Sequence, residues 1–128
     1  MDHSPHLKAL KNMNVVATNY SMLLNTNGSE NGSVKVDFLN LKKAAMILRA
    51  LNHKLRQQIV KLVDDNKRLT VTEIYVRLRL EQSVASQHLA ILRRAGIVRT
   101  ERDGKFIYYS VNYNRVDQVM KSAEDLVT

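Results

Sequence analysis

Residues 81–96, EQSVASQHLAILRRAG, constrain the fold of this 128-residue chain more than any other stretch. At helical spacing, Ala85, Leu89 and Leu92 fall on one face, which predicts a helix that packs this face inward. The first turns carry short polar side chains and one small apolar side chain away from that face: Gln82, Ser83, Val84, Ser86 and Gln87. Two arginines and a glycine end the stretch, as is typical of a helix C-terminus.

The polar tip of this predicted helix has the chemistry that reads DNA bases. Amide and hydroxyl groups such as those of Gln87 and Ser86 can hydrogen-bond base edges in the major groove, and Val84 can contact a thymine methyl group. An ordinary surface helix of a small helical domain would show the same pattern. The stretch alone therefore leaves both interpretations open, and the flanking segments discriminate between them.

The segment before this helix predicts a helix-turn-helix. Thr70 followed by Glu73 is a capping box, and Leu69 and Ile74 occupy the hydrophobic staple positions beside it. The helix that begins there is short and ends near residue 79. A short helix, a tight turn and a second helix with a polar tip form the helix-turn-helix pattern.

The segment after the helix predicts a β-hairpin. Residues 97–102 and 105–111 are rich in strand-forming side chains and flank Asp103 and Gly104. Asp-Gly between two such runs predicts a type I′ turn with positive φ at both residues. Arg102 and Lys105 then lie beside the turn, where a hairpin that follows a recognition helix can reach phosphates or the minor groove.

Three further helices complete the expected domain. Residues 38–51 carry two apolar faces, residues 113–127 carry one apolar stripe, and between them lies a helix capped by Asn52 or His53 with Arg56 on its outside. The expected fold is mainly α with a small β-hairpin: a winged helix-turn-helix with five core helices. Pairing of the first and last helices of the domain across a two-fold axis would bury both surplus apolar faces in a dimer.

Residues 1–33 are expected to be an N-terminal arm outside the domain, which spans residues 34–128. Apolar residues recur in the arm at intervals compatible with a helix over residues 5–24, although many intervening residues are mediocre helix formers. Residues 25–33, NTNGSENGS, predict a linker by composition.

The charge of the chain is unevenly placed. Twenty Lys and Arg against 12 Asp and Glu give a net charge of +8, and residues 1–33 balance to zero. The excess lies in residues 42–68 and 77–105, which fits a protein that docks a polyanion on one surface. A generally basic protein is the alternative.

Several classes of function lack support in the sequence. The absence of cysteine excludes disulfides, thiolate metal sites and cysteine nucleophiles. We expect no enzyme and no bound cofactor, because no phosphate loop or nucleophile motif is present. Neither a signal peptide nor an apolar run of membrane-spanning length is found, so a cytoplasmic location without membrane contact is expected. The four histidines form no obvious metal motif, although a free Met1-Asp2-His3 terminus could chelate Cu(II) or Ni(II) adventitiously.

Over about residues 41–127 the chain resembles the ArsR family of winged-helix bacterial repressors. The recognition-helix signature of the family, Gln-Ser-x-x-Ser-x-His-Leu-x-x-Leu-x-x-Ala-Gly, fits residues 82–96 at every fixed position. The family pattern Leu-Ser-Val-x-Glu-Leu is similar to residues 69–74, and Leu-Ala-Asp-Pro-Thr-Arg-Leu-Arg-Ile-Leu is similar to residues 51–60. An acidic-Gly turn followed by a Tyr-Tyr pair resembles Asp103-Gly104 and Tyr108-Tyr109.

The resemblance implies a homodimer that binds double-stranded DNA and represses transcription. Each recognition helix would enter a major groove, and two-fold symmetry implies an inverted-repeat operator with half-sites about one helical turn apart. The resemblance assigns base-edge or nearby backbone contacts to Gln82, Ser83, Val84, Ser86 and Gln87. It makes His88 and Arg56 phosphate-binding or structural candidates, and Arg102 and Lys105 wing candidates for phosphate.

The chain departs from the family pattern at the metal-sensing positions. Tyr75 and Arg77 occupy the places of a Cys-x-Cys pair, and the last helix contains no histidine. We therefore expect no metal at the family sites, and Asp117, Glu124 and Asp125 are interpreted as a solvated face. An alternative function is a winged-helix protein-interaction module regulated through the N-terminal arm.

Overall fold

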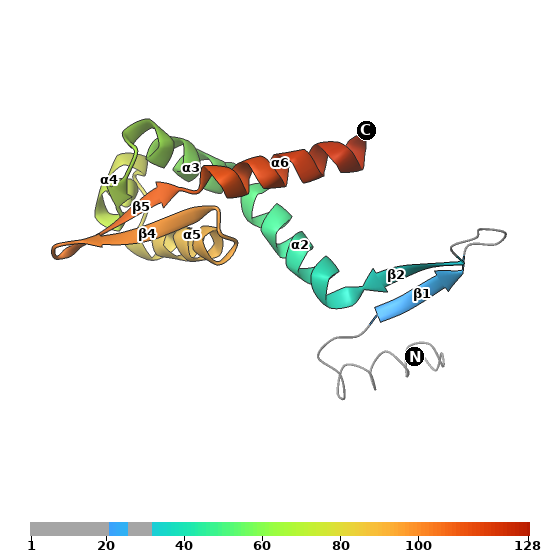
Figure 1. Ribbon diagram of the computed structural model, residues 1–128. Helices are drawn as coiled ribbons and strands as arrows, with labels where there is room; N and C mark the ends of the chain where they lie inside the picture. Colours follow the sequence, from blue (N-terminus) through green and yellow to red (C-terminus); the bar gives the residue numbers. More distant parts are fainter. Residues whose placement is uncertain (1–20, 26–31) are drawn as a thin grey trace, which may run out of the picture. The chain divides into compact units, whose positions relative to one another are not determined.

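The computed structural model describes residues 21–25 and 32–128, and the chain divides into two units, 1–45 and 46–128, with one helix running across the division. The described residues form five helices and five strands (Figure 1). In chain order they are β1 (Ser21–Asn25), β2 (Ser33–Asp37), α2 (Phe38–Leu51), α3 (Lys54–Asn66), β3 (Leu69–Thr70), α4 (Val71–Leu78), α5 (Gln82–Arg94), β4 (Val98–Asp103), β5 (Phe106–Val111) and α6 (Tyr113–Val127). The expected five helices and β-hairpin are thereby confirmed.

An antiparallel pair of strands, β1 and β2, lies in the first unit. The helix predicted for residues 5–24 is wrong at residues 21–24, which belong to β1, and its remainder lies outside the described residues. Met22 pairs with Val36 and Leu24 with Val34, so β-branched side chains across the ladder favour the strand over an isolated helical turn. Asn25 and Ser33, the ends of the predicted linker, pair with each other. The division of the chain at residue 33 stays a prediction.

The largest completely buried side chains of the second unit come from α3, α4, α5 and the segment that enters β4. Ile59, Ile74, Leu89, Leu92 and Ile97 are completely buried there. The stripe predicted from residues 81–96 is confirmed, because Ala85 is also completely buried beside Leu89 and Leu92. This core holds α5 by one face only and leaves its opposite face to solvent.

A three-stranded sheet in the order β3–β5–β4 anchors the wing to the helix-turn-helix. Leu69 pairs with Tyr109 and Thr70 with Tyr108, a two-residue ladder that the sequence pattern did not predict. Thr70 also caps α4: its hydroxyl accepts from the Glu73 N–H at 3.2 Å, and the Glu73 carboxylate accepts from the Thr70 N–H at 3.0 Å. The capping box is therefore confirmed, and the backbone N–H of Thr70 lowers the pKa of Glu73.

The turn of the wing lies one residue later than predicted. Asp103 pairs with Phe106, so the two central residues are Gly104 and Lys105 rather than Asp103 and Gly104. Only Gly104 of these has positive φ, +62°. Glycine at the first central position is the chemistry of a type II′ turn, and the predicted type I′ turn is wrong because it needs positive φ at both central residues.

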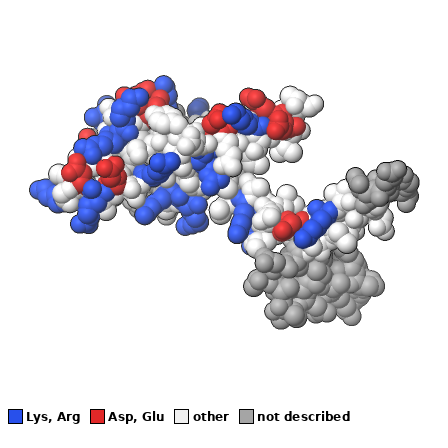
Figure 2. Space-filling model, in the orientation of Figure 1, with Lys and Arg blue, Asp and Glu red and all other residues white. Residues whose placement is uncertain are grey.

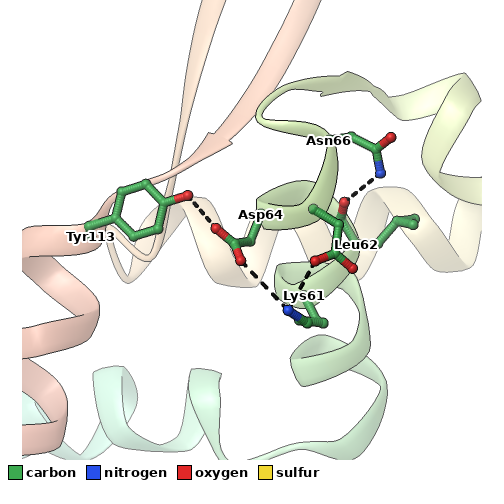
Figure 3. Close-up of polar contacts among 6 residues, drawn as sticks. Lys61, Leu62, Asp64, Asn66 and Tyr113 are labelled. Atoms are coloured by element: carbon green, nitrogen blue, oxygen red, sulfur yellow. Dashed lines mark hydrogen bonds and ion pairs between the residues drawn. The ribbon is translucent and has the colours of Figure 1, made fainter.

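Polar contacts join the start of α6 to α3 (Figure 3). The Tyr113 hydroxyl donates to Asp64, and this hydrogen bond raises the pKa of Tyr113 and lowers that of Asp64. The Lys61 ammonium lies 3.8 Å from Asp64 and 2.9 Å from Asp65. Beyond this attachment, α6 contributes one residue, Val119, to the buried part of the described chain. No helix in the described ranges is long and apolar enough to cross a membrane.

Candidate nucleic-acid interface

A tight turn sets the direction of α5 relative to α4. Arg79 ends α4 in the left-handed region at φ 54°, and its N–H donates to the carbonyls of Tyr75 and Val76. The Leu80 N–H donates to the Tyr75 carbonyl at 2.9 Å. The chain therefore reverses within three residues, and α5 starts at Gln82.

The predicted base-reading residues lie together at the start of α5. Gln82, Ser83, Ser86 and Gln87 are exposed and Val84 is half-buried. Glu81, the N-cap residue of α5, makes no side-chain capping hydrogen bond in the described structure. The first N–H groups of α5 thus lack a side-chain acceptor here, and such groups at a helix N-terminus favour an anion such as a phosphate.

The end of α5 is closed by a glycine that no other residue replaces easily. Gly96 has φ +77°, and a Cβ there would lie 3.1 Å from Nε of Arg115. The Gly96 N–H donates to the Arg93 carbonyl at 2.9 Å, and the Ile97 N–H donates to the Leu92 carbonyl at 2.9 Å. The left-handed residue lets the chain leave α5 and enter β4 directly, which places the wing beside the recognition helix (Figure 1).

The wing carries both predicted cations and an apolar surface. Arg102 and Lys105 are exposed, and the Lys105 ammonium lies 5.4 Å from the centroid of the Phe106 ring. Phe106 and Ile107 are large apolar residues that remain 49% and 46% exposed. The tip of the hairpin therefore offers positive charge together with apolar side chains.

Arg68 is a wing contact that sequence reasoning missed. Its guanidinium lies 3.1 Å from Asp103 and 4.0 Å from the centroid of the Tyr108 ring. Arg68 thereby places a positive charge beside the one acidic side chain next to the turn. No local pattern could have found this contact, since 35 residues separate Arg68 from Asp103.

Arg56 does not lie on the outside of its helix, and that prediction is wrong. Its side chain is 6% exposed and is the buried charged group of the described chain. It donates from Nε to the Ala50 carbonyl at 2.6 Å and from Nη2 to the Arg49 carbonyl at 2.9 Å. The carbonyls at the end of α2 attract the cation because they have no partner within their own helix.

His88 joins the same network from the recognition helix. Nη1 of Arg56 lies 3.3 Å from Nδ1 of His88, and the rings of His53 and His88 lie 4.9 Å apart between centroids. Burial lowers the pKa of His88, with smaller contributions from His53 and Arg56. The structure thus brings together two histidines that the sequence treats as unrelated. Within residues 21–25 and 32–128, no group of three or more His, Cys, Asp and Glu side chains could hold a metal ion.

Basic side chains are concentrated over the helix-turn-helix and the wing. Figure 2 shows many Lys and Arg there on the visible face with a few acidic side chains among them, whereas acidic side chains make up a larger share on α6. The exposed arginines near α5 and the wing include Arg77, Arg79, Arg93, Arg94, Arg99 and Arg102. A helix with an exposed polar tip, a β-hairpin beside it and a basic surface around both define the winged helix-turn-helix class of DNA-binding proteins.

Comparisons with known proteins identify the family. The model of the bacterial regulatory protein arsR family matches residues 53–100. The transcriptional repressor PagR of Bacillus anthracis is 36% identical over 87 residues, covering 68% of this chain and 87% of PagR. The transcriptional activator HlyU of Vibrio cholerae is 38% identical over 82 residues, covering 64% of this chain and 75% of HlyU.

The crystal structure of PagR aligns with a TM-score of 0.55 at 35% identity, covering 67% of this chain and 98% of PagR. This chain belongs to the arsR family of bacterial regulatory proteins, and it is a DNA-binding transcriptional regulator.

Proposed function

We propose that this chain is a cytoplasmic repressor that binds an inverted-repeat operator as a homodimer, without a bound cofactor. The exposed tip of α5 carries the proposal. Gln82, Ser83, Ser86 and Gln87 are all exposed, while the opposite face of the same helix is completely buried. Such a helix is rigidly held and presents hydrogen-bonding groups outward, as major-groove recognition requires.

The proposed contacts follow from the surroundings of each side chain. Gln82, Ser83, Val84, Ser86 and Gln87 contact base edges or the adjacent backbone. Arg102 and Lys105 on the wing contact phosphates, and His88 contacts a phosphate at the flank of α5. Arg56 is buried at 6% exposure, so its role is to support the recognition helix rather than to touch DNA.

Exposed apolar side chains on α2 and α6 support the homodimer. Met120, Leu126 and Val127 on α6 are 45%, 76% and 83% exposed, and Leu41 on α2 is 58% exposed. A cavity of about 330 Å³ lies between the end of α2 and α6, lined by Leu48, Leu51, Asn52, Gln57, Val119, Met120 and Ala123. A second copy of α6 and of the end of α2 would cover the apolar side chains around this cavity.

The two relatives differ in the sign of regulation, since PagR is a repressor and HlyU an activator. We propose repression, the action of PagR and of the family that the sequence resembles. Transcription in vitro from the gene's own promoter tests this assignment. Added protein should reduce the amount of transcript, and an increase would show that the protein is an activator.

DNA binding is tested with the DNA upstream of the chain's own gene. Footprinting should protect two half-sites about one helical turn apart, and affinity should fall steeply as salt rises. A micromolar solution of the protein that gives no salt-sensitive shift on this fragment would rule out the repressor proposal.

A second candidate function is a winged-helix module that binds another protein, regulated through the N-terminal arm. Phe106 and Ile107, about half exposed on the wing, favour it. This function predicts weak, sequence-independent DNA binding. It also predicts that Phe106→Ser would abolish partner binding without changing the salt dependence on DNA.

A further inference from the structure

A continuous set of hydrogen bonds joins the end of α2 to the recognition helix. Arg56 donates to two carbonyls of the last turn of α2, those of Arg49 and Ala50, and its third nitrogen reaches His88 of α5. The backbone N–H of Arg56 donates to Nδ1 of His53, the N-cap of α3. One buried side chain of α3 thus links two other segments of the fold, the end of α2 and α5.

Arg56 determines which nitrogen of His88 carries the proton. A guanidinium has only donors, so Nδ1 of His88, 3.3 Å from Nη1 of Arg56, accepts with its lone pair. A neutral imidazole that accepts at Nδ1 carries its hydrogen on Nε2. Burial, and to a smaller extent the facing groups His53 and Arg56, lower the pKa of His88 and so favour the neutral ring over the protonated one.

The Nε2–H group of His88 is available to an acceptor outside the described chain. His88 is half-buried and directly follows exposed Gln87, so it lies at the border between the core face and the outer face of α5. No residue within 21–25 and 32–128 accepts a hydrogen bond from its Nε2. Half or more of the hydrogen bonds between proteins and DNA go to phosphate and sugar oxygens, so a phosphate is the commonest acceptor for such a donor.

We infer that His88 binds a DNA phosphate through Nε2–H as a neutral donor, and that Arg56 is the positioning residue that holds the ring in this tautomer. The inference rests on the proposed DNA-binding function. A neutral donor adds affinity without adding positive charge. His88 therefore differs from Arg102 and Lys105, whose phosphate contacts release counterions.

The tautomer is measured on the free protein, without DNA. In nitrogen-15 NMR of the imidazoles, His88 should show a protonated Nε2 and an unprotonated Nδ1 at neutral pH, with the signals assigned by their loss in His88→Gln. Arg56→Met removes the donor and should produce a mixture of tautomers. A wild-type His88 protonated at Nδ1 would overturn the inference, whatever the protein does with DNA.

The phosphate contact is measured with two variants that leave Arg56 and its bonds to α2 in place. His88→Gln puts an amide donor near the position of Nε2, whereas His88→Asn puts one near Nδ1. His88→Asn should bind DNA about ten-fold more weakly, the effect expected of one hydrogen bond to a charged group. His88→Gln should lose less affinity for DNA. Cooperative urea unfolding of both variants checks that each is folded.

Two controls separate this contact from the others. The loss for His88→Asn should be equal on the upstream fragment and on a random duplex of the same length, because a phosphate carries no sequence information. Its salt slope should match that of the wild type. Unchanged affinity of His88→Asn, or a smaller slope, would refute the phosphate contact. Failure of the wild type to bind any DNA would refute the proposed function, while the NMR result would still decide the tautomer.

Discussion

Helices α5 and α6 are both amphipathic and similar in length, yet they use their apolar faces differently. Within the described structure α5 buries Ala85, Leu89 and Leu92 completely in the core of its own unit. α6 buries Val119 and leaves Leu126 and Val127 largely exposed. An apolar stripe therefore marks a face that needs covering, but it does not say whether the same chain or a second copy covers it.

The outer faces of the two helices also differ, in the polar and charged side chains that they carry. α5 presents uncharged hydrogen-bonding side chains at its tip and arginines at its end, with a basic wing alongside. α6 carries Asp117, Glu124 and Asp125, and the ion pair between Lys121 and Asp117 at 2.9 Å neutralises part of its charge. The charge distribution thus favours DNA at α5 and disfavours it at α6.

The largest expected effect is on the free energy of unfolding, when a leucine in the apolar face of each helix is replaced by alanine. Leu89→Ala on α5 should lower the free energy of unfolding by about 2–5 kcal/mol, since it leaves a cavity in a completely buried site. Leu126→Ala on α6, at 76% exposure, should change it by about 0.5 kcal/mol or less when the protein is too dilute to dimerise. Urea unfolding measures both, and equal losses would contradict the contrast between the helices.

The next largest effect concerns the exposed face of α6. Met120→Lys combined with Leu126→Lys should weaken dimerisation by at least about 2 kcal/mol, because two apolar anchors are replaced by charges that resist desolvation. Analytical ultracentrifugation gives the dissociation constant. Asp125→Lys is the matched control, since it changes the net charge by the same amount on the opposite side of the helix. If it weakens the dimer equally, charge rather than the apolar face is responsible.

A smaller effect is expected at the outer face of α5. Gln87→Ala should reduce affinity for the operator by about 1–3 kcal/mol, the usual value of one base contact, and leave affinity for random DNA nearly unchanged. Fluorescence anisotropy on both duplexes measures the difference. Equal losses on both would assign Gln87 to the backbone and remove its base-reading role.

The smallest effect is a change in the slope of log affinity against log salt. Arg102→Ala combined with Lys105→Ala should reduce the dependence of log affinity on log salt by about 1.8 per protomer, about 0.9 for each phosphate contact. Lys61→Ala combined with Lys121→Ala removes the same charge from α3 and α6 and should leave the slope close to that of the wild type. A wing variant that also keeps the wild-type slope would show that the wing does not contact the backbone.

Most of the second unit was predictable because its signals are local. The stripe of α5, the capping box at Thr70 and the hairpin after Gly96 each depend on residues a few positions apart. Backbone geometry alone relates such residues, so the pattern is visible before folding. The turn was predicted wrongly, at Asp103-Gly104 instead of Gly104-Lys105, since glycine suits a central position of either turn type.

Residues 21–24 illustrate the limit of local patterns in the first unit. Their apolar spacing fits a helix when it is continued from residue 5, but the structure pairs them with residues 34–37 in a β-ladder. Met22, Leu23 and Leu24 are good helix formers, but cross-strand pairing with Val34 and Val36 outweighs this local preference.

The sequence by itself determined the helix-turn-helix, the wing and the group of base-reading candidates on α5, because each follows from short-range spacing and side-chain chemistry. Only the tertiary structure decided what supports that helix. Arg56 and His88 are 32 positions apart, and Arg68 and Asp103 are 35 apart. Contacts at such separations exist only once the core has brought the segments together. The folded core buries Arg56 as a link between α2 and α5, whereas the sequence had predicted an exposed position on the outside of its helix.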